Sequence, residues 1–194
     1  MGERRHAPII VSVDDERQIR TLHRGPVFDV DIVEWRGRDG TPVEKIVVRH
    51  RGAVAVVPEL DDGRLVLIRN HRHSLDSWLV EFCAGGVAAG ESSADAARRE
   101  LAEETGYRAG RLDPLGSFFT TPGFSDELMQ VFVARDLVAG MPSLEPDERI
   151  ETLAMDPEEL ATAIDAGEIR DGKTIAAFRL WEGRRDATSA ETST

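Results

Sequence analysis

The stretch that most constrains the fold covers residues 85–107 and reads Gly-Gly-Val-Ala-Ala-Gly-Glu-Ser-Ser-Ala-Asp-Ala-Ala-Arg-Arg-Glu-Leu-Ala-Glu-Glu-Thr-Gly-Tyr. It predicts a helix from about Ser93 to Thr105, because Ser92 is a favourable N-cap and Gly106 stands just past the last turn. The preceding loop, Ala84-Gly85-Gly86, is rich in glycine and so allows another group to approach its backbone closely.

Three carboxylates share one face of the predicted helix. Glu100, Glu103 and Glu104 are spaced three and four residues apart, so their side chains are neighbours. At an effective dielectric of 20, each repulsion between them is roughly 3 kcal/mol. Arg99 relieves part of it as the i, i+4 partner of Glu103, and a hard divalent cation relieves more, because oxygen ligands suit Mg²⁺ or Mn²⁺. A solvated acidic helix face is the alternative interpretation.

Composition limits the classes of partner. The chain has 194 residues, which fits one domain with an arm or a tail. Its 24 Lys and Arg against 36 Asp and Glu give a net charge of −12, which disfavours nucleic acid and anionic membranes as partners. Cys83 is the only cysteine, which excludes an intrachain disulfide and a cysteine-based zinc cluster. The apolar run Ala7–Val13 is too short for a signal sequence, so we expect a cytoplasmic protein.

Apolar patterns predict strands on both sides of this helix. Residues 28–33 alternate in the manner of a half-buried strand, and residues 45–49 return after an Asp-Gly turn. The continuous apolar run over residues 52–58 predicts a strand that is covered on both faces. The other strand candidates are residues 64–69, 78–82, 128–134 and 150–155.

Two further helices are expected towards the C-terminus. One begins near Asp156-Pro157 and ends near Gly167, with proline and acids in its first turn. The other covers Thr174 to Trp181, and the small, polar residues 184–194 are predicted to be disordered. The order of elements indicates one α/β domain with a strand-rich N-terminal arm, which packs on the domain or on a second subunit.

Residues 85–107 resemble the Nudix box. All its specified positions are matched, and they are Gly85, Glu91, Arg99, Glu100, Leu101, Glu103, Glu104, Gly106 and Tyr107. The resemblance implies an α/β/α sandwich with a mixed sheet, divided into an arm over residues 1–50, a Nudix domain over 51–183 and a tail over 184–194. It also implies a hydrolase that uses Mg²⁺ or Mn²⁺ and cleaves a nucleoside diphosphate linked to another moiety.

The resemblance also assigns roles by position. Glu100 and Glu104 would be direct metal ligands, and Glu103 would be a ligand directly or through water; Glu103 and Glu104 would thereby serve catalysis. The backbone carbonyl of Ala84 would also face a metal. The remaining residues of the box would orient this cluster, and they are Gly85, Glu91, Arg99 and Gly106.

Two features outside the box resemble the ADP-ribose pyrophosphatase group. Residues 81–85, Glu-Phe-Cys-Ala-Gly, resemble its Glu-x-Pro-Ala-Gly sequence, with Cys83 at the proline position. Pro122 lies fifteen residues beyond Tyr107, where that group has a proline. The implied reaction is hydrolysis of ADP-ribose to AMP and ribose 5-phosphate. Two alternatives are hydrolysis of another nucleoside diphosphate sugar, such as GDP-mannose, and nucleotide sensing without catalysis.

The acidic loop over residues 145–151 is the expected source of a general base. In related enzymes a glutamate of this loop takes a proton from the attacking water. Glu148 matches that position best, and Glu145 and Glu151 are the alternatives.

Substrate contacts are expected from one strand end and from the arm. Arg72 is expected to meet the phosphates, because a guanidinium pairs bidentately with phosphate. His71 and His73 are expected to face opposite ways, so we assign them no metal. Phe28 or Trp35 would stack on adenine. Because such arms are exchanged between subunits in the family, the resemblance implies a homodimer.

Overall fold

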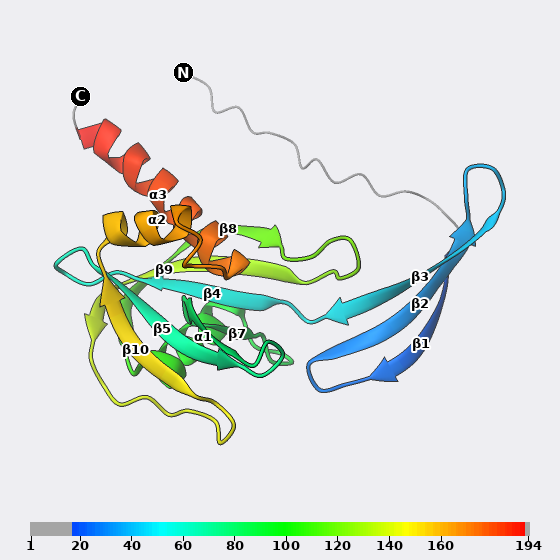
Figure 1. The fold of residues 1–194 in the computed structure, drawn as a ribbon, viewed down its shortest axis with the longest axis horizontal. Coiled ribbons are helices and arrows are strands. Elements are labelled where there is room, and N and C mark those ends of the chain that lie inside the picture. The colour runs from blue at the N-terminus through cyan, green and yellow to red at the C-terminus, as the bar shows by residue number, and fades with distance from the viewer. Residues whose placement is uncertain (1–16, 193–194) are drawn as a thin grey trace.

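The computed structural model describes residues 17–192, with side chains described for residues 17–185 (Figure 1). Residues 1–16, which include the run Ala7–Val13 and the start of the predicted arm, lie outside the described residues. The strands are β1 (Gln18–Arg24), β2 (Phe28–Arg36), β3 (Pro42–His50), β4 (Ala53–Pro58), β5 (Leu65–Arg72), β6 (Ser77–Glu81), β7 (Ala84–Gly86), β8 (Arg108–Phe119), β9 (Leu128–Val138) and β10 (Ile150–Met155). The helices are α1 (Ser93–Glu100), its continuation η1 (Leu101–Thr105), α2 (Pro157–Asp165) and α3 (Gly172–Thr192).

The first three strands form the arm, which projects from the rest of the molecule in Figure 1. They pair antiparallel in the order β1-β2-β3, and Gly40 at φ 81° makes the predicted turn between β2 and β3. The hairpin of the sequence analysis is therefore confirmed, and β1 adds a third strand. β1 was not predicted because its side chains are exposed on both faces and show no apolar alternation.

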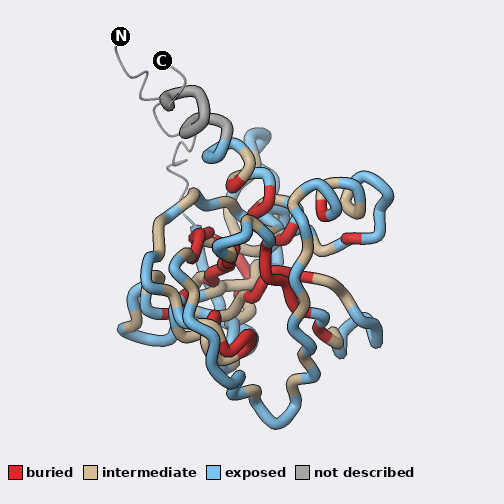
Figure 2. Tube along the Cα trace, turned by 90° about the vertical axis from the view of Figure 1, so that its left-hand side faces the viewer, coloured by how far each residue is buried: buried red, intermediate tan, exposed pale blue. Residues whose placement is uncertain are grey.

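The core is divided by strand β4. All six of its residues are buried, as the continuous apolar run predicts. Ala53, Ala55 and Val57 face one cluster that includes residues of α2 and α3, whereas Val54 and Val56 face a second cluster beneath α1. Helices therefore cover both faces of the sheet. Figure 2 shows the buried segments in the interior of the molecule.

Two sheets make up the domain behind the arm. One has the order β7-β4-β9-β8 and is mixed, because β4 and β9 run parallel while the other pairs are antiparallel. The other has the order β10-β5-β6. Within the described part of the chain, no helix is long and apolar enough to cross a membrane.

The helix of the box begins and ends where the sequence predicts. Ser92 accepts a hydrogen bond of 3.1 Å from the backbone N–H of Asp95, and Gly106 ends the helix at φ 78°. A Cβ on Gly106 would lie 2.7 Å from the carbonyl oxygen of Gly140, so the position also requires the absence of a side chain. The last turn, η1, is a π-helix, which the apolar spacing does not reveal.

Strand β8 and the C-terminal end differ from the predictions. β8 was missed because Gly110, Pro114 and Gly116 interrupt its apolar pattern; its register shifts between Pro114 and Gly116, and such a bulge accommodates both residues. The prediction of a disordered tail is wrong for residues 184–192, which continue α3. Arginine, alanine and glutamate are good helix formers and extend a helix that is already anchored by buried residues. Residues 193–194 lie outside the described residues.

Candidate active site

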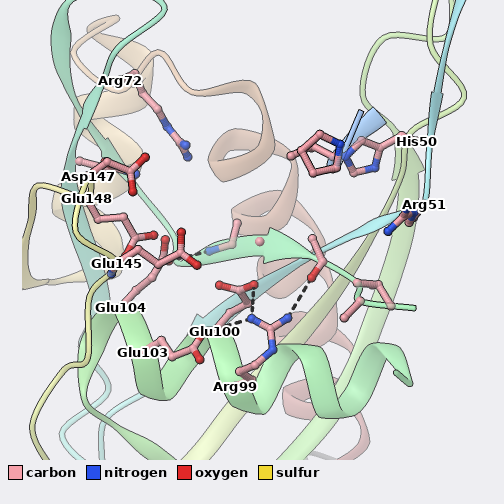
Figure 3. Close-up of a pocket in the computed structure, with 18 of the residues that line it drawn as sticks. His50, Arg51, Arg72, Arg99, Glu100, Glu103, Glu104, Glu145, Asp147 and Glu148 are labelled. Atoms are coloured by element: carbon pink, nitrogen blue, oxygen red, sulfur yellow. Dashed lines mark hydrogen bonds and ion pairs between the residues drawn. The ribbon is translucent and has the colours of Figure 1, made fainter. Parts of the chain in front are cut away.

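A cavity of about 770 Å³ opens where the arm, the end of β5, the strand β7 and the helix of the box meet (Figure 3). Its walls bring together side chains that are far apart in the sequence. Six carboxylates line it, and they are those of Glu100, Glu103, Glu104, Glu145, Asp147 and Glu148. Arg51, Arg72 and Arg99 are the arginines among its lining residues. The acidic helix face of the sequence analysis therefore lines a concave site and is not simply solvated.

Arg99 is the centre of the ionic contacts on the helix side of the cavity. Its Nη1 donates to Oε1 of Glu100 at 2.7 Å and to Oε2 of Glu103 at 3.0 Å. Its Nε and Nη2 donate to the two carboxylate oxygens of Glu91 at 2.9 and 3.0 Å, and Nη2 also donates to the carbonyl oxygen of Gly86. The hydrogen bonds from Arg99 lower the pKa of Glu91 to about 2. Glu91 and Arg99 thus hold the loop against the helix.

Glu104 is a buried carboxylate at the centre of the site. Its Oε2 accepts a hydrogen bond of 2.9 Å from the backbone N–H of Ala84, which joins the helix to β7. Burial raises the pKa of Glu104 to about 8, and the charges of Glu100 and Glu148 act in the same direction. Burial also raises the pKa of Glu100. A site that disfavours its own negative charges in this way is suited to a bound cation.

Gly85 is required by close packing. A Cβ at this position would lie 2.0 Å from Oε1 of Glu100, far inside any van der Waals contact. The glycine of the loop therefore makes room for the carboxylate of Glu100, in agreement with the expectation that the glycine-rich loop allows close approach to its backbone. Gly86 differs, because a Cβ there would meet nothing within 4 Å.

The donor set suits a hard divalent cation. Three carboxylates of the helix and the backbone at Ala84 lie on one wall, and carboxylate and carbonyl oxygens are the ligands that Mg²⁺ and Mn²⁺ prefer. Among the described residues, no three Asp, Glu, His or Cys side chains already form a ligand set. Instead Arg99 lies between Glu100 and Glu103, and Glu104 bonds to Ala84.

The acidic loop before β10 faces this helix across the cavity (Figure 3). Oε2 of Glu148 accepts a hydrogen bond of 2.7 Å from the backbone N–H of Glu145, so Glu148 also closes the turn of its own loop. Glu151, the third alternative for a base, does not line the cavity; it lies on β10 and pairs with Arg69 at 3.4 Å. Glu148 and Glu145 are therefore the alternatives that the cavity contains.

Arg72 reaches into the cavity from the end of β5, opposite the helix (Figure 3). Its Nε donates to both carboxylate oxygens of Glu81, at 2.9 and 3.2 Å, and its Nη2 donates to Oε2. Glu81 is fully buried and also bonds to Nζ of Lys173. Burial alone would raise the pKa of Glu81, but the hydrogen bonds of Arg72 and the charge of Lys173 outweigh it, and the pKa is lowered.

The other expected substrate contacts do not line the cavity of the same chain. Phe28 is exposed on the arm, where its neighbour Val27 lines the cavity. Trp35 lies further along β2 and Pro122 lies in the loop between β8 and β9; neither is among the lining residues. The loop of Pro122 instead binds the arm, since Asp126 accepts from the backbone N–H of His50 at 2.8 Å.

The expectation that the side chains of His71 and His73 face opposite ways is wrong. Their rings contact each other edge to face, with centroids 5.3 Å apart, and both line the cavity. Residues two apart on a strand face the same side, and β5 ends between these two.

Some residues of the site carried no usable signal in the sequence. Lys173 meets Glu81 although the two are 92 residues apart, and the sequence analysis assigned Lys173 no role. Asp147 lies between Glu145 and Glu148, and only its place in the acidic loop points to it. Val27 and Arg51 reach the cavity because of the way the arm is placed, which no local pattern predicts.

Comparison with known proteins shows the family of this chain. The NUDIX domain family matches residues 49–178. An ADP-ribose pyrophosphatase of Bacillus subtilis (strain 168) is 34% identical over 160 residues, which are 81% of this chain and 86% of that protein. A GDP-mannose pyrophosphatase of Yersinia enterocolitica is 29% identical over 164 residues, which are 79% and 83% of the two chains. The crystal structure of an ADP compounds hydrolase superposes with a TM-score of 0.75 at 26% identity, covering 90% of this chain and 95% of that one.

Proposed function

Because this chain belongs to the NUDIX family and is a Nudix hydrolase, we propose that it hydrolyses the diphosphate of ADP-ribose to AMP and ribose 5-phosphate. One observation carries the proposal: three carboxylates of one helix face three acids of a distant loop and Arg72 across a single cavity. Carboxylates on two walls of the cavity, together with the guanidinium of Arg72, suit an anionic substrate that binds together with divalent metal ions.

The metal is proposed to be Mg²⁺ or Mn²⁺. Glu100, Glu104 and the carbonyl of Ala84 would hold it, with Glu103 as a ligand directly or through water. A bound divalent ion of this kind supplies neutralisation of the diphosphate and acidification of a water molecule. Gly85, Glu91, Arg99 and Gly106 keep the ligands in place by the contacts described above, since ligand carboxylates need partners that fix their orientation.

The remaining steps belong to side chains of the cavity. Glu148 takes the proton of the attacking water, and Glu145 is the alternative base. Arg72 binds the diphosphate, whose charge suits a guanidinium. Val27 of the arm lines the cavity, and the exposed ring of its neighbour Phe28 would stack on adenine. Pro122 acts through the loop that fixes the arm.

A second candidate substrate is another nucleoside diphosphate sugar, such as GDP-mannose. The similarity to the GDP-mannose pyrophosphatase of Yersinia enterocolitica favours it, at a lower identity than the ADP-ribose pyrophosphatase of Bacillus subtilis. The chemistry at the diphosphate is the same for both substrates, so base and sugar contacts decide between them.

A homodimer in the cytoplasm is the proposed state of the protein. The arm exposes Ile19 on one face and Ile46 on the other, each 58% accessible, and a three-stranded sheet that projects in this way needs a partner surface. A second copy of the chain would cover these residues and bring Trp35 of one arm towards the cavity of the other subunit. A reducing compartment suits the single cysteine, Cys83, which is buried as a free thiol.

The direct test of the proposal is Glu104→Gln. The variant keeps the hydrogen bond from Ala84 but lacks the charge that a metal needs, so we expect it to fold and to lose at least about a hundredfold in Mg²⁺-dependent turnover of ADP-ribose. Folding is followed by circular dichroism, and turnover by release of AMP. Turnover at the wild-type rate would remove Glu104 from the metal site.

A further inference from the structure

A buried ion-pair network lies behind the catalytic cavity and reaches it through one side chain. Glu81 at the end of β6 is fully buried, and its carboxylate bonds to Arg72 from β5 and to Lys173 from α3. Nζ of Lys173 also pairs with Asp171 at 2.9 Å. Two cations and two carboxylates, from β5, β6, α3 and the residue before α3, thus form a neutral cluster in which only Arg72 is substantially exposed, at 38% of its side chain.

The contacts of Arg72 use one edge of its guanidinium. Nε and Nη2 are bound to Glu81, whereas Nη1 has no hydrogen-bond partner in the described part of the chain. The guanidinium is planar, so a carboxylate that binds one edge fixes the direction in which the other edge points. Arg72 lines both the cavity of the carboxylates and the neighbouring cavity beside Lys173.

The other end of the network is anchored by the first turn of α3. Oγ1 of Thr174 accepts a hydrogen bond of 2.9 Å from the backbone N–H of Phe82, and Thr174 in turn donates to Asp171. Lys173 and Thr174 therefore hold Glu81 and Phe82, the two residues that lead towards Ala84. These contacts fix the carboxylate of Glu81. They come from the first turn of α3, which does not line the cavity of the carboxylates.

We propose that Glu81 is a positioning residue for substrate binding: it holds the guanidinium of Arg72 so that Nη1 is presented to the diphosphate. The inference rests on the proposed function, because it takes a diphosphate as the substrate. Preorganisation of this kind reduces the side-chain entropy that is lost when the substrate binds, so its removal affects affinity more than the chemical step.

The experiment is a double-mutant cycle with Arg72→Met, Glu81→Gln and the double variant, in Mg²⁺ with ADP-ribose. KM and kcat are measured together with the dissociation constant of the non-hydrolysable α,β-methylene analogue. We expect each single variant to raise KM and the dissociation constant about tenfold, as for the loss of one charge-assisted hydrogen bond, with kcat changed less than about threefold. Because Glu81 acts through Arg72, the double variant is expected to be no weaker than Arg72→Met.

Two controls separate positioning from mere stability. Arg69→Met removes an arginine of the same strand that pairs with the exposed Glu151 and does not line the cavity, and it is expected to leave KM unchanged. Arg72→Lys keeps the charge and Glu81 but lacks the planar fork, so it is expected to raise KM as Arg72→Met does. This variant also tests the inference if Glu81→Gln does not fold.

The outcomes are distinct. A wild-type KM in Arg72→Lys would overturn the inference. So would a wild-type KM in a Glu81→Gln variant that folds but has a lowered melting temperature. The inference would also fail if Glu81→Gln raised KM in the Arg72→Met background by as much as it does in the wild type. If the wild-type protein neither binds the analogue nor hydrolyses ADP-ribose, the proposed function itself has failed.

Discussion

The carboxylate of Glu100 lies against the backbone of Gly85, in the space that a methyl side chain at position 85 would occupy. A Cβ on Gly85 would lie 2.0 Å from Oε1 and 2.4 Å from Oε2 of Glu100. The backbone of β7 is therefore packed directly against a proposed metal ligand, and the loop and the helix of the box form one unit.

Gly85→Ala tests this packing. The methyl group must displace Glu100, so we expect the affinity for Mn²⁺ to fall by about 10- to 100-fold, as for other changes that misplace metal ligands. Mn²⁺ binding is measured by isothermal titration calorimetry. Gly86→Ala is the matched control, because its Cβ meets nothing within 4 Å, and it is expected to keep wild-type affinity. Equal affinities in the two variants would show that Glu100 is not held as described.

Glu104 predicts an unusual dependence of stability on pH in the metal-free protein. Its pKa is raised from 4.5 to about 8 on folding, so the folded chain keeps this proton between those values while the unfolded chain releases it. The contribution of this group is complete below about pH 4.5 and is lost as the pH rises towards 8, on the order of a few kcal/mol.

The comparison with Glu104→Gln isolates this contribution. Glutamine has no proton to lose. In EDTA, the melting temperature of the variant is therefore expected to increase relative to that of the wild type as the pH rises from 5 to 8.5. Thermal unfolding followed by circular dichroism at each pH measures the difference. A difference that grows towards acid pH would have the wrong sign and would show that Glu104 is ionised in the metal-free protein.

Glu148 is predicted to act on the water and not on substrate affinity. Glu148→Gln retains an oxygen that can accept from the backbone N–H of Glu145, so the loop is expected to keep its turn. Removal of a general base lowers kcat by about 10²- to 10⁴-fold, and KM is expected to change much less. Glu151→Gln is the control, because Glu151 lies outside the cavity. If kcat of Glu148→Gln is unchanged, the base is Glu145 or another group.

We predict that the dimer depends on exposed apolar side chains of the arm. Ile46→Glu places a charge where a second copy is proposed to pack, so light scattering after size exclusion is expected to show the monomer mass at micromolar concentration. Val138→Glu changes a similarly exposed residue at the end of β9 and is expected to leave the dimer intact. A monomeric wild-type protein would remove the arm from assembly and leave the stacking role of Trp35 without support.

The parts of the fold that sequence reasoning reached are those encoded locally. Ser92, the acidic face and Gly106 define one helix within fifteen residues, and the apolar run of β4 shows by itself that both of its faces are covered. The π turn η1 was not accessible in this way, because an extra residue in one turn hardly alters the apolar spacing. β8 was hidden by the proline and glycines of its bulge.

The residues of the site also differ in whether a local sequence pattern indicates them. Its proposed metal ligands lie in one short motif, and the resemblance of that motif to the Nudix box was sufficient to propose them. Arg72 was chosen for the chemistry of its side chain, but its partner Glu81 and the anchor Lys173 are brought together only by the packing of α3 against the sheet. The places of Trp35 and Pro122 depend on how the arm sits, which involves contacts between distant segments such as that of Asp126 with His50.

The cavity is proposed to hydrolyse a diphosphate with metal and to prefer ADP-ribose. The most direct measurement incubates the wild-type protein with Mg²⁺ and ADP-ribose, GDP-mannose, ADP-glucose, NADH or a nucleoside triphosphate, with and without EDTA, and identifies the products by chromatography. We expect AMP and ribose 5-phosphate as the products, formed fastest from ADP-ribose and not formed in the presence of EDTA. Faster cleavage of GDP-mannose would contradict the substrate assignment, and binding without cleavage of any compound would contradict the claim of catalysis itself.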